Sequence, residues 1–361
     1  MAVFNKIRIK NFRGIKELEL TKFKQFNIIV GNNETGKTSV LEALYISINP
    51  GNPNLPVTAN IHRGIDTPDN FQFWVSLYKD YNTENLIELD STLFKTQKIK
   101  LKISPITTPP VVTSDNIATD LSNQSASTEY IVQGLRSHFT YDSNNNHAIN
   151  QNTEIIFSLI NPQKPFITKL PEKWKSIING FYLSIQNTYG QDLATRVGEL
   201  ITLKQEKELV GILQELDSKI KDITLDAASR VVVDYEGLPH RILINSLGEG
   251  IYRVTNIITL IYRSRNGVVL IDEVETGLDR KSQIKLMKAI FSAALKYNVQ
   301  LFFTTHSIEL IDALYEVATL EKNEENITLI RLERDDNRMI RPIYFDYQQI
   351  QYSRNQGWEI R

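Results

Sequence analysis

The stretch that decides the fold is Gly31-Asn32-Asn33-Glu34-Thr35-Gly36-Lys37-Thr38. It fits the pattern G-x-x-x-x-G-K-[ST], whose backbone wraps phosphate groups. Residues 26–30 before it are apolar and predict a strand, and residues 39–45 after it carry apolar side chains at helical spacing. A strand, a glycine-rich loop and a helix start direct backbone N–H groups at a phosphate. We therefore expect a nucleoside triphosphate site here rather than a chance glycine turn.

Individual roles within this motif follow from its chemistry. We expect Lys37 to reach the β- and γ-phosphates and the Thr38 hydroxyl to bind Mg²⁺. The remaining residues that we expect to contact ATP here are Asn32, Asn33, Glu34, Thr35, Gly36 and Ser39.

Composition narrows the class of protein. Of the 361 residues, 41% are hydrophobic and 23% are charged, as in ordinary soluble proteins. The net charge of -1 excludes a global basic field, so any nucleic-acid binding needs a local patch. The lack of cysteine excludes disulfides, cysteine-zinc sites and thiol nucleophiles, and it suits the cytoplasm. We find no secretion signal and no apolar run of about 20 residues, so we expect no membrane association.

The N-terminal part alternates between apolar and polar residues. This pattern predicts strands at 3–9, 18–20, 71–77, 86–89 and 99–103, which would form an antiparallel layer beside the nucleotide-binding strand. A basic cluster lies at its end and consists of Lys95, Lys98, Lys100 and Lys102. We interpret the cluster as the solvent face of a strand, with a phosphate-contacting surface as the alternative.

The middle of the chain changes character. Residues 105–155 are polar and rich in turn formers, which favours an insertion or loops with one short helix near Tyr130. Helical periodicity returns over 171–225, with two apolar faces. Their residues are Trp174, Ile177, Ile178 and Phe181 for the first face, and Leu209, Ile212, Leu213 and Leu216 for the second.

Acidic residues follow a second apolar strand. Residues 268–271 are continuously apolar, as in a parallel strand buried on both faces, and Asp272 and Glu273 follow directly. Such a pair can end a strand merely for solubility. Beside a phosphate-binding loop, however, Asp272 can hold Mg²⁺ and Glu273 can orient or deprotonate the attacking water. We therefore interpret them as the Walker B pair.

A histidine ends the neighbouring strand. After a predicted helix around 284–295, the apolar strand 299–303 leads to His306. The two strands and the helix form a β-α-β unit with polar residues at the strand ends, where open α/β sheets bind ligands. His306 could be a hydrogen-bonded loop residue, but this position favours a contact with the γ-phosphate.

A second anion-binding helix start is predicted at Ser246-Leu247-Gly248-Glu249-Gly250. One chain does not need two such ends at one γ-phosphate, whereas two chains facing head to tail do. The alternative is a plain N-cap.

The order of these motifs resembles the ABC-type ATPase heads of the SMC, RecF and OLD families. Residues 10–14, KNFRG, match the start of those heads. Residues 246–251, 271–278, 299–307 and 357–361 resemble the corresponding stretches of AAA15-type, OLD-like ATPases. The resemblance covers residues 1 to about 90 and about 200 to 361. The chain departs from the transporter signature at Leu247, which replaces a glycine.

The resemblance implies an α/β fold, an ABC-type (P-loop NTPase) ATPase head with an antiparallel β layer and a partly helical insertion. Residues 1–104 would form the first part of the head, residues 105–225 the polar and helical insertion, and residues 226–361 the second part.

The resemblance also assigns further site residues. Arg13 would join the ATP-binding residues. Ser246, Gly248 and Glu249 would act in trans as the signature, and Asp279, where relatives often have histidine, would belong to a D-loop. Secondary candidates are Glu275, which could replace Glu273 as the catalytic carboxylate or be a plain surface acid, and Gln72, as the Q-loop glutamine.

The function so implied is Mg²⁺-dependent binding and hydrolysis of ATP by a homodimer, or higher oligomer, with ATP between its heads. It would regulate a separately encoded effector, a nuclease or toxin, in anti-phage defence or DNA maintenance. The chain ends before a Toprim domain, so we expect no nuclease site of its own. The alternatives are a RecF- or SMC-like DNA-binding ATPase in repair and an ATP-switched binding module with little turnover. A transporter ATPase is disfavoured by KNFRG and Leu247.

Overall fold

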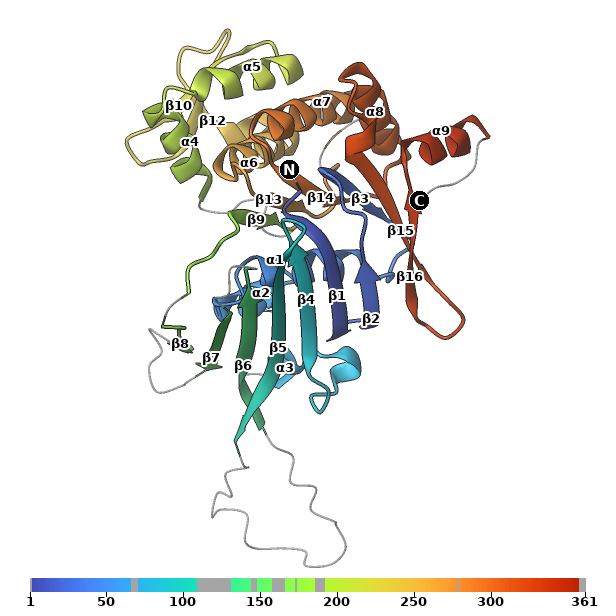
Figure 1. Cartoon of the computed structure of the whole chain (residues 1–361). Helices are drawn as coiled ribbons and strands as arrows, with labels where there is room; N and C mark the ends of the chain where they lie inside the picture. Colours follow the sequence, from blue (N-terminus) through green and yellow to red (C-terminus); the bar gives the residue numbers. More distant parts are fainter. Residues whose placement is uncertain are drawn as a thin grey trace, which may run out of the picture.

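The computed structural model describes residues 2–65, 71–108, 131–143, 148–157, 166–172, 174–185, 192–276, 278 and 280–356. Two sheets face each other, and helix α1 (Lys37–Ile48) packs between them (Figure 1). The described helices include none that is long and apolar enough to cross a membrane.

A six-stranded sheet carries the nucleotide-binding loop. Its order is β16-β15-β3-β14-β13-β9, with β16 antiparallel and all other neighbouring pairs parallel. The bounds are β16 (Ile340–Phe345), β15 (Ile327–Arg334), β3 (Phe26–Val30), β14 (Gln300–Thr304), β13 (Val268–Ile271) and β9 (Gly180–Leu183). Every residue of β3, β13 and β14 is buried, which explains their continuous apolar sequences and confirms the central parallel strand.

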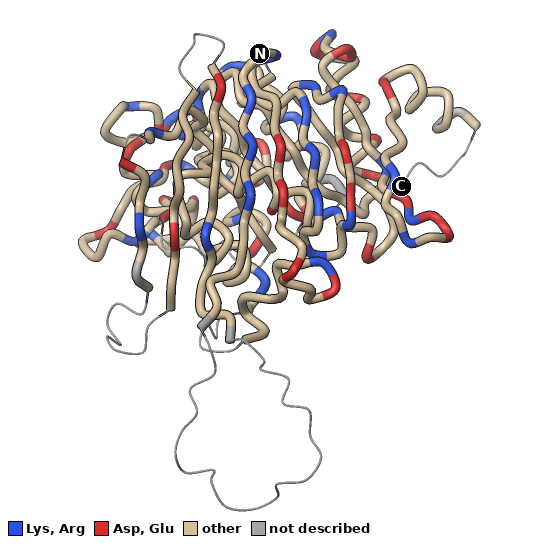
Figure 2. The backbone as a smooth tube through the Cα atoms, turned by 60° about the horizontal axis from the view of Figure 1, so that its bottom comes forward, with Lys and Arg blue, Asp and Glu red and all other residues tan. Residues whose placement is uncertain are grey.

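A seven-stranded antiparallel sheet covers the other side of α1. Its strands, in spatial order, are β2 (Ile15–Leu20), β1 (Phe4–Phe12), β4 (Ile87–Leu93), β5 (Gln97–Thr108), β6 (Ile131–Asp142), β7 (Ile149–Phe157) and β8 (Phe166–Lys169). Apolar side chains from one face join the core around α1. Basic and acidic residues recur along the strands of this sheet (Figure 2). The lysines at 95, 98, 100 and 102 are exposed, so the solvent-face interpretation is confirmed.

The remaining helices cover the outer face of the six-stranded sheet or flank the two sheets (Figure 1). The elements that pack over that outer face are α4 (Asp192–Thr202), α5 (Glu206–Leu216), α6 (Glu249–Arg263), α7 (Arg280–Lys296) and α8 (Ile308–Leu320). The others are α2 (Asn54–Ile61), α3 (Phe71–Val75) and α9 (Tyr347–Asn355), with 3₁₀ turns at Lys79–Tyr81, Ile244–Leu247 and Glu324–Asn326. A small sheet of β10 (Ile220–Leu225), β11 (Val231–Tyr235) and β12 (Ile242–Leu243) completes the described elements.

Two predicted elements in the N-terminal and middle parts are wrong. The strand predicted over 71–77 is helix α3, in which Phe73, Trp74 and Val75 are buried in succession, so the apparent alternation did not reflect two faces. The short helix predicted near Tyr130 is strand β6, which pairs with β5 and β7. The segment is polar overall, so the row of buried side chains in β6, which includes Leu135 and Phe139, gave no clear strand pattern.

The predicted helical segment 171–225 is partly wrong. Residues 174–179 have no helix, and Phe181 lies in the edge strand β9, which pairs with β13. The helical face 209–216 is confirmed as α5. The boundaries 1–104, 105–225 and 226–361 stay a prediction, although β5 crosses the first of them and β6, β7 and β8 extend the same sheet.

Candidate nucleotide site

The loop between β3 and α1 is shaped by two glycines. Gly31 has φ 139° and Gly36 has φ 90°, a region that side chains rarely adopt. A Cβ on Gly31 would lie 2.4 Å from the Leu332 carbonyl oxygen, so only glycine fits there. Inside the loop, the Thr35 hydroxyl donates to the Asn32 carbonyl oxygen at 2.8 Å. The two glycines and the Thr35 hydroxyl therefore hold the loop in this shape.

Lys37 lies across the loop. Its Nζ donates to the carbonyl oxygens of Gly31 at 2.8 Å and Asn32 at 3.0 Å. Burial lowers the pKa of Lys37, and the carboxylates of Asp272 and Glu273 act in the opposite direction. The fold thus places a buried lysine at the position where phosphate charge is expected.

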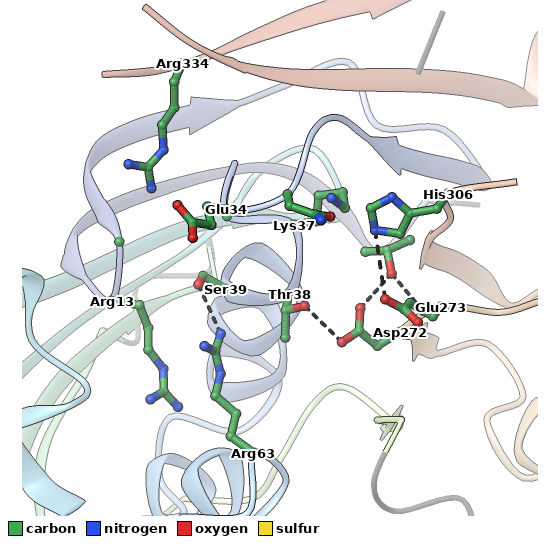
Figure 3. Close-up of a pocket in the computed structure, with 14 residues that line it drawn as sticks. Arg13, Glu34, Lys37, Thr38, Ser39, Arg63, Asp272, Glu273, His306 and Arg334 are labelled. Carbon is green, nitrogen blue, oxygen red and sulfur yellow. Dashed lines mark hydrogen bonds and ion pairs between the residues drawn. The ribbon is translucent and has the colours of Figure 1, made fainter. Parts of the chain in front are cut away.

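Asp272 joins the end of β13 to the loop. Thr38 Oγ1 donates to its Oδ2 at 3.0 Å, and Thr304 Oγ1 donates to its Oδ1 at 2.6 Å (Figure 3). Burial raises the pKa of Asp272, and these two hydroxyl groups lower it. Thr38 and Asp272, both assigned to the metal from the sequence, therefore lie side by side.

The donor set fits Mg²⁺. Mg²⁺ in phosphate-transfer sites takes one or two protein oxygen ligands and completes its shell with water and substrate phosphate. Thr38 and Asp272 offer such oxygens, and the described residues contain no cluster of three or more His, Cys, Asp or Glu that could hold a metal alone.

Glu273 points into the cavity from a strained backbone. Its φ of 45° is uncommon for a residue other than glycine and costs on the order of 1–3 kcal/mol. Its N–H donates to Thr304 Oγ1 at 2.8 Å, which helps to hold that conformation. Its Oε1 lies 3.9 Å from His306 Nε2, so the two residues predicted to be catalytic face each other. Glu275 has a different position, because its Oε1 accepts the His306 backbone N–H at 2.7 Å.

These groups border a cavity of about 480 Å³ (Figure 3). The predicted residues that line it are Arg13, Asn33, Glu34, Gly36, Lys37, Thr38, Ser39, Asp272, Glu273 and His306. Sequence reasoning missed four lining residues, which are Gly14, Arg63, Thr304 and Arg334.

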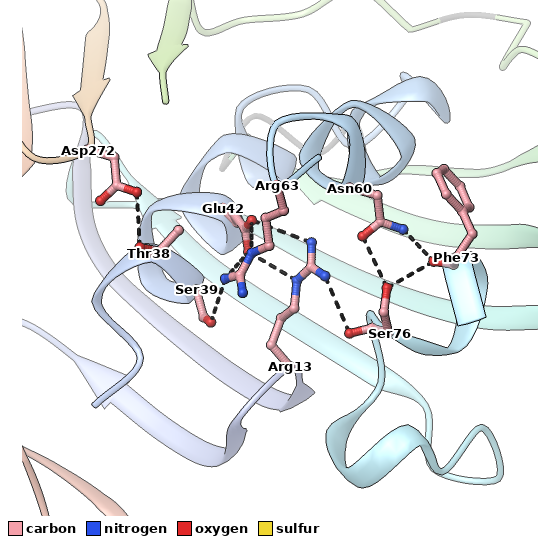
Figure 4. A network of polar contacts seen from close by, with 9 residues as sticks. All are labelled: Arg13, Thr38, Ser39, Glu42, Asn60, Arg63, Phe73, Ser76 and Asp272. Carbon is pink, nitrogen blue, oxygen red and sulfur yellow. Dashed lines mark hydrogen bonds and ion pairs between the residues drawn. The ribbon is translucent and has the colours of Figure 1, made fainter. Parts of the chain in front are cut away.

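Two arginines share one buried carboxylate at the cavity wall (Figure 4). Arg13 Nε lies 3.1 Å from Glu42 Oε2, and Arg63 Nε lies 2.6 Å from Glu42 Oε1. Burial is the main cause that lowers the pKa of Arg13 to about 10, so it stays cationic at neutral pH. Arg63 also donates to Ser39 Oγ at 3.2 Å. A carboxylate within the apolar stretch of α1 was the signal that could have revealed this cluster, because a buried charge needs partners.

Several assigned residues lie away from the cavity. Asn32 and Thr35 shape the loop, and Gln72 is exposed on α3. The signature residues Ser246, Gly248 and Glu249 are exposed at the start of α6 and do not line the cavity of their own chain. Asp279 and the C-terminal stretch 357–361 lie outside the described residues.

Comparison with protein families decides the class. Residues 3–311 match the family model AAA_15, described as an AAA ATPase domain. The chain belongs to this ATPase family. Its predicted identity as an ABC-class ATPase is thereby confirmed.

The chain is also similar to individual curated proteins and solved structures. A Helicobacter pylori protein named ATP/GTP phosphatase is 25% identical over 359 residues, covering 94% of this chain and 95% of its own. The RecF protein of Citrifermentans bemidjiense is 42% identical over 41 residues, 11% of either chain. An SMC head bound to the winged-helix domain of ScpA has a TM-score of 0.51 at 9% identity, over 96% of this chain and 99% of that one. A Pyrococcus furiosus SMC head has a TM-score of 0.50 at 9% identity, over 99% and 100%. The predicted ABC-type P-loop fold is thus confirmed.

His306→Ala is expected to reduce ATP hydrolysis more than ATP binding. The imidazole faces Glu273 in the cavity. We expect it to contact the γ-phosphate, whose charge changes most during phosphoryl transfer. Turnover and nucleotide titrations on the same preparation measure the two effects, with His138→Ala on the outer sheet face as the control. An equal loss of ADP and ATP affinity would instead assign His306 a role in folding.

Proposed function

We propose that this AAA_15 protein hydrolyses ATP with Mg²⁺ at a site completed by a second copy of the chain. The contact between Thr38 and Asp272 carries the first part of the proposal. It brings together two oxygens that would bind Mg²⁺, one from the first turn of α1 and one from the residue after β13, and Glu273 beside them would activate water. Thr38 and Asp272 would hold the metal, which would neutralise the charge of the triphosphate during phosphoryl transfer.

The exposed signature segment supports the second part. Ser246, Gly248 and Glu249 are accessible to a second copy and do not line their own chain's cavity. A helix start with free N–H groups attracts an anion, and a head-to-tail pair would place one such start over each triphosphate. The two sites of the dimer would then be equivalent by two-fold symmetry.

The biological role that we propose is regulation of a separately encoded effector, a nuclease or toxin, in anti-phage defence or DNA maintenance in the cytoplasm. It rests on the resemblance to OLD-like ATPases. The name of the Helicobacter pylori relative further suggests that GTP as well as ATP is a substrate.

A RecF-type DNA-binding function has less support from the charged sheet face. Neighbouring strands there alternate in sign, since Lys10 and Lys102 both lie opposite Glu88. Arg8 and Lys100 both lie opposite Asp90 in the same way. Such pairing neutralises the lysine rows that a phosphate-binding surface would need. Arg13, the other candidate for such a patch, is buried against Glu42.

The proposed function predicts a dimer that depends on both ATP and Mg²⁺. Light scattering on a sizing column should show the mass of one chain without nucleotide and twice that mass with Mg²⁺ and a non-hydrolysable ATP analogue. EDTA should return the protein to the smaller mass, because it removes the Mg²⁺ that would neutralise the triphosphate between the two copies. A mass that never changes with nucleotide would contradict the proposal.

A further inference from the structure

A buried arginine connects the signature helix to the catalytic strand end. Arg253 lies one turn into α6, close after the signature residues, and it is completely buried. Its Nη2 donates to the carbonyl oxygen of Asp272 at 2.8 Å and to that of Glu273 at 2.7 Å. The helix that begins at the signature is therefore fastened to the backbone of both Walker B residues.

This contact acts on a segment that needs support. Glu273 has a φ of 45°, and such a backbone persists only where the surrounding structure holds it. On one side, the N–H of Glu273 donates to Thr304 Oγ1 and that of Val274 donates to the Thr304 carbonyl oxygen. On the other side, Arg253 donates hydrogen bonds to the carbonyl oxygens of Asp272 and Glu273. The catalytic carboxylate is thus positioned between β14 and α6.

Arginine suits this position for physical reasons. Hydrogen bonds from a charged donor are about twice as strong as neutral ones, and one guanidinium nitrogen can serve both carbonyls. Burial lowers the pKa of Arg253, and the carboxylates of Glu275 and Glu249 act in the opposite direction by stabilising the guanidinium charge. Loss of the group would leave the buried carbonyl oxygen of Asp272 and the partly buried one of Glu273 without this donor.

We propose that Arg253 is a positioning residue through which the signature of one copy controls Glu273 of the same copy. The inference rests on the proposed function, in which that signature is engaged by the partner's nucleotide. A small shift of α6 on engagement would move the carbonyls of Asp272 and Glu273 with it. ATP bound in one site of the dimer would thereby set the catalytic group of the other site, and the two sites would act cooperatively.

The test compares Arg253→Met with Arg253→Lys in the full-length protein with Mg²⁺ and ATP. Arg253→Met should keep the KM for ATP and the ATP-dependent dimer, and its kcat should fall about a hundredfold, as expected for a catalytic group displaced by about 1 Å. The Hill coefficient for ATP should lie between 1 and 2 in the wild type and fall to about 1 in Arg253→Met. Arg253→Lys should recover part of the lost kcat and part of the lost Hill coefficient, because an ammonium group can still donate to the two carbonyls.

Arg196→Met is the matched control. Arg196 is also buried and also binds α6, but it donates to Asn256 at 2.5 Å and Thr259 at 3.1 Å, away from the catalytic strand end. Its loss should lower the unfolding temperature and leave kcat unchanged. An equal fall of kcat in Arg196→Met would reduce the Arg253 effect to general destabilisation and overturn the inference.

Two failures can be told apart. If the wild type forms the ATP-dependent dimer but Arg253→Met keeps the wild-type kcat and Hill coefficient, the inference fails and the proposed function stands. If the wild type forms no dimer with Mg²⁺ and a non-hydrolysable ATP analogue, the proposed function fails, and with it the control of Glu273 by the signature.

Discussion

Glu273→Gln is expected to bind ATP normally and to hydrolyse it about a hundred to ten thousand times more slowly, the usual range for loss of a general base. The amide keeps the size and the backbone contacts of Glu273 but cannot accept a proton from water. Because hydrolysis no longer opens the dimer, the ATP-bound dimer should accumulate. Single-turnover hydrolysis and light scattering with ATP measure the two effects.

Glu275→Gln provides the control for this variant. Its amide oxygen can still accept the His306 backbone N–H that Glu275 Oε1 accepts, so turnover should remain close to that of the wild type. Wild-type turnover in Glu273→Gln together with a loss in Glu275→Gln would transfer the catalytic role to Glu275.

Lys37→Ala is expected to abolish measurable ATP binding. It removes the ammonium group that neutralises the β- and γ-phosphates, and charged hydrogen bonds of about 1.5–3 kcal/mol each correspond to a loss of roughly a hundredfold or more in affinity. Equilibrium titration with a fluorescent ATP analogue measures this loss. Because Lys37 also binds two loop carbonyls, a thermal unfolding curve without nucleotide should accompany the titration. Unchanged affinity in the variant would make the loop structural only.

Sequence reasoning succeeded where one local pattern determines the structure. The loop at 31–38 is self-contained, since its glycines and its own hydrogen bonds set its shape. The strands β3, β13 and β14 are buried on both faces, so their apolar runs stand out. The parallel pairing of β13 with β14 then brings Asp272 and His306 to one sheet edge.

Sequence reasoning failed where distant packing determines the structure. Strand β6 reads as polar because its outer face is solvated, and its pairing with β5 across residues 109–130 is not a local signal. Strand β9 is four residues long and depends on β13 for its hydrogen bonds. Arg63 and Arg334 reach the cavity from α2's C-terminal end and from β15, and neither belongs to a motif.

The central claim, a site shared between two copies, is tested most directly by mixing two inactive variants. Lys37→Ala retains an intact signature, and Ser246→Arg retains an intact phosphate-binding loop. Each alone should be nearly inactive. In an equal mixture about half of the dimers combine the two chains and hold one complete site, so ATPase activity should return to at most about a quarter of the wild-type level, and to less if the two sites act cooperatively.

The mixture must be shown to contain mixed dimers, for example by pull-down of one tagged variant with the other. Recovery of turnover that follows the fraction of mixed dimers is the predicted result. No recovery at any mixing ratio, although mixed dimers form, would mean either that the two sites act only together or that the signature acts within its own chain. A structure with a bound ATP analogue in which Ser246 approaches the γ-phosphate of its own chain would contradict the shared site.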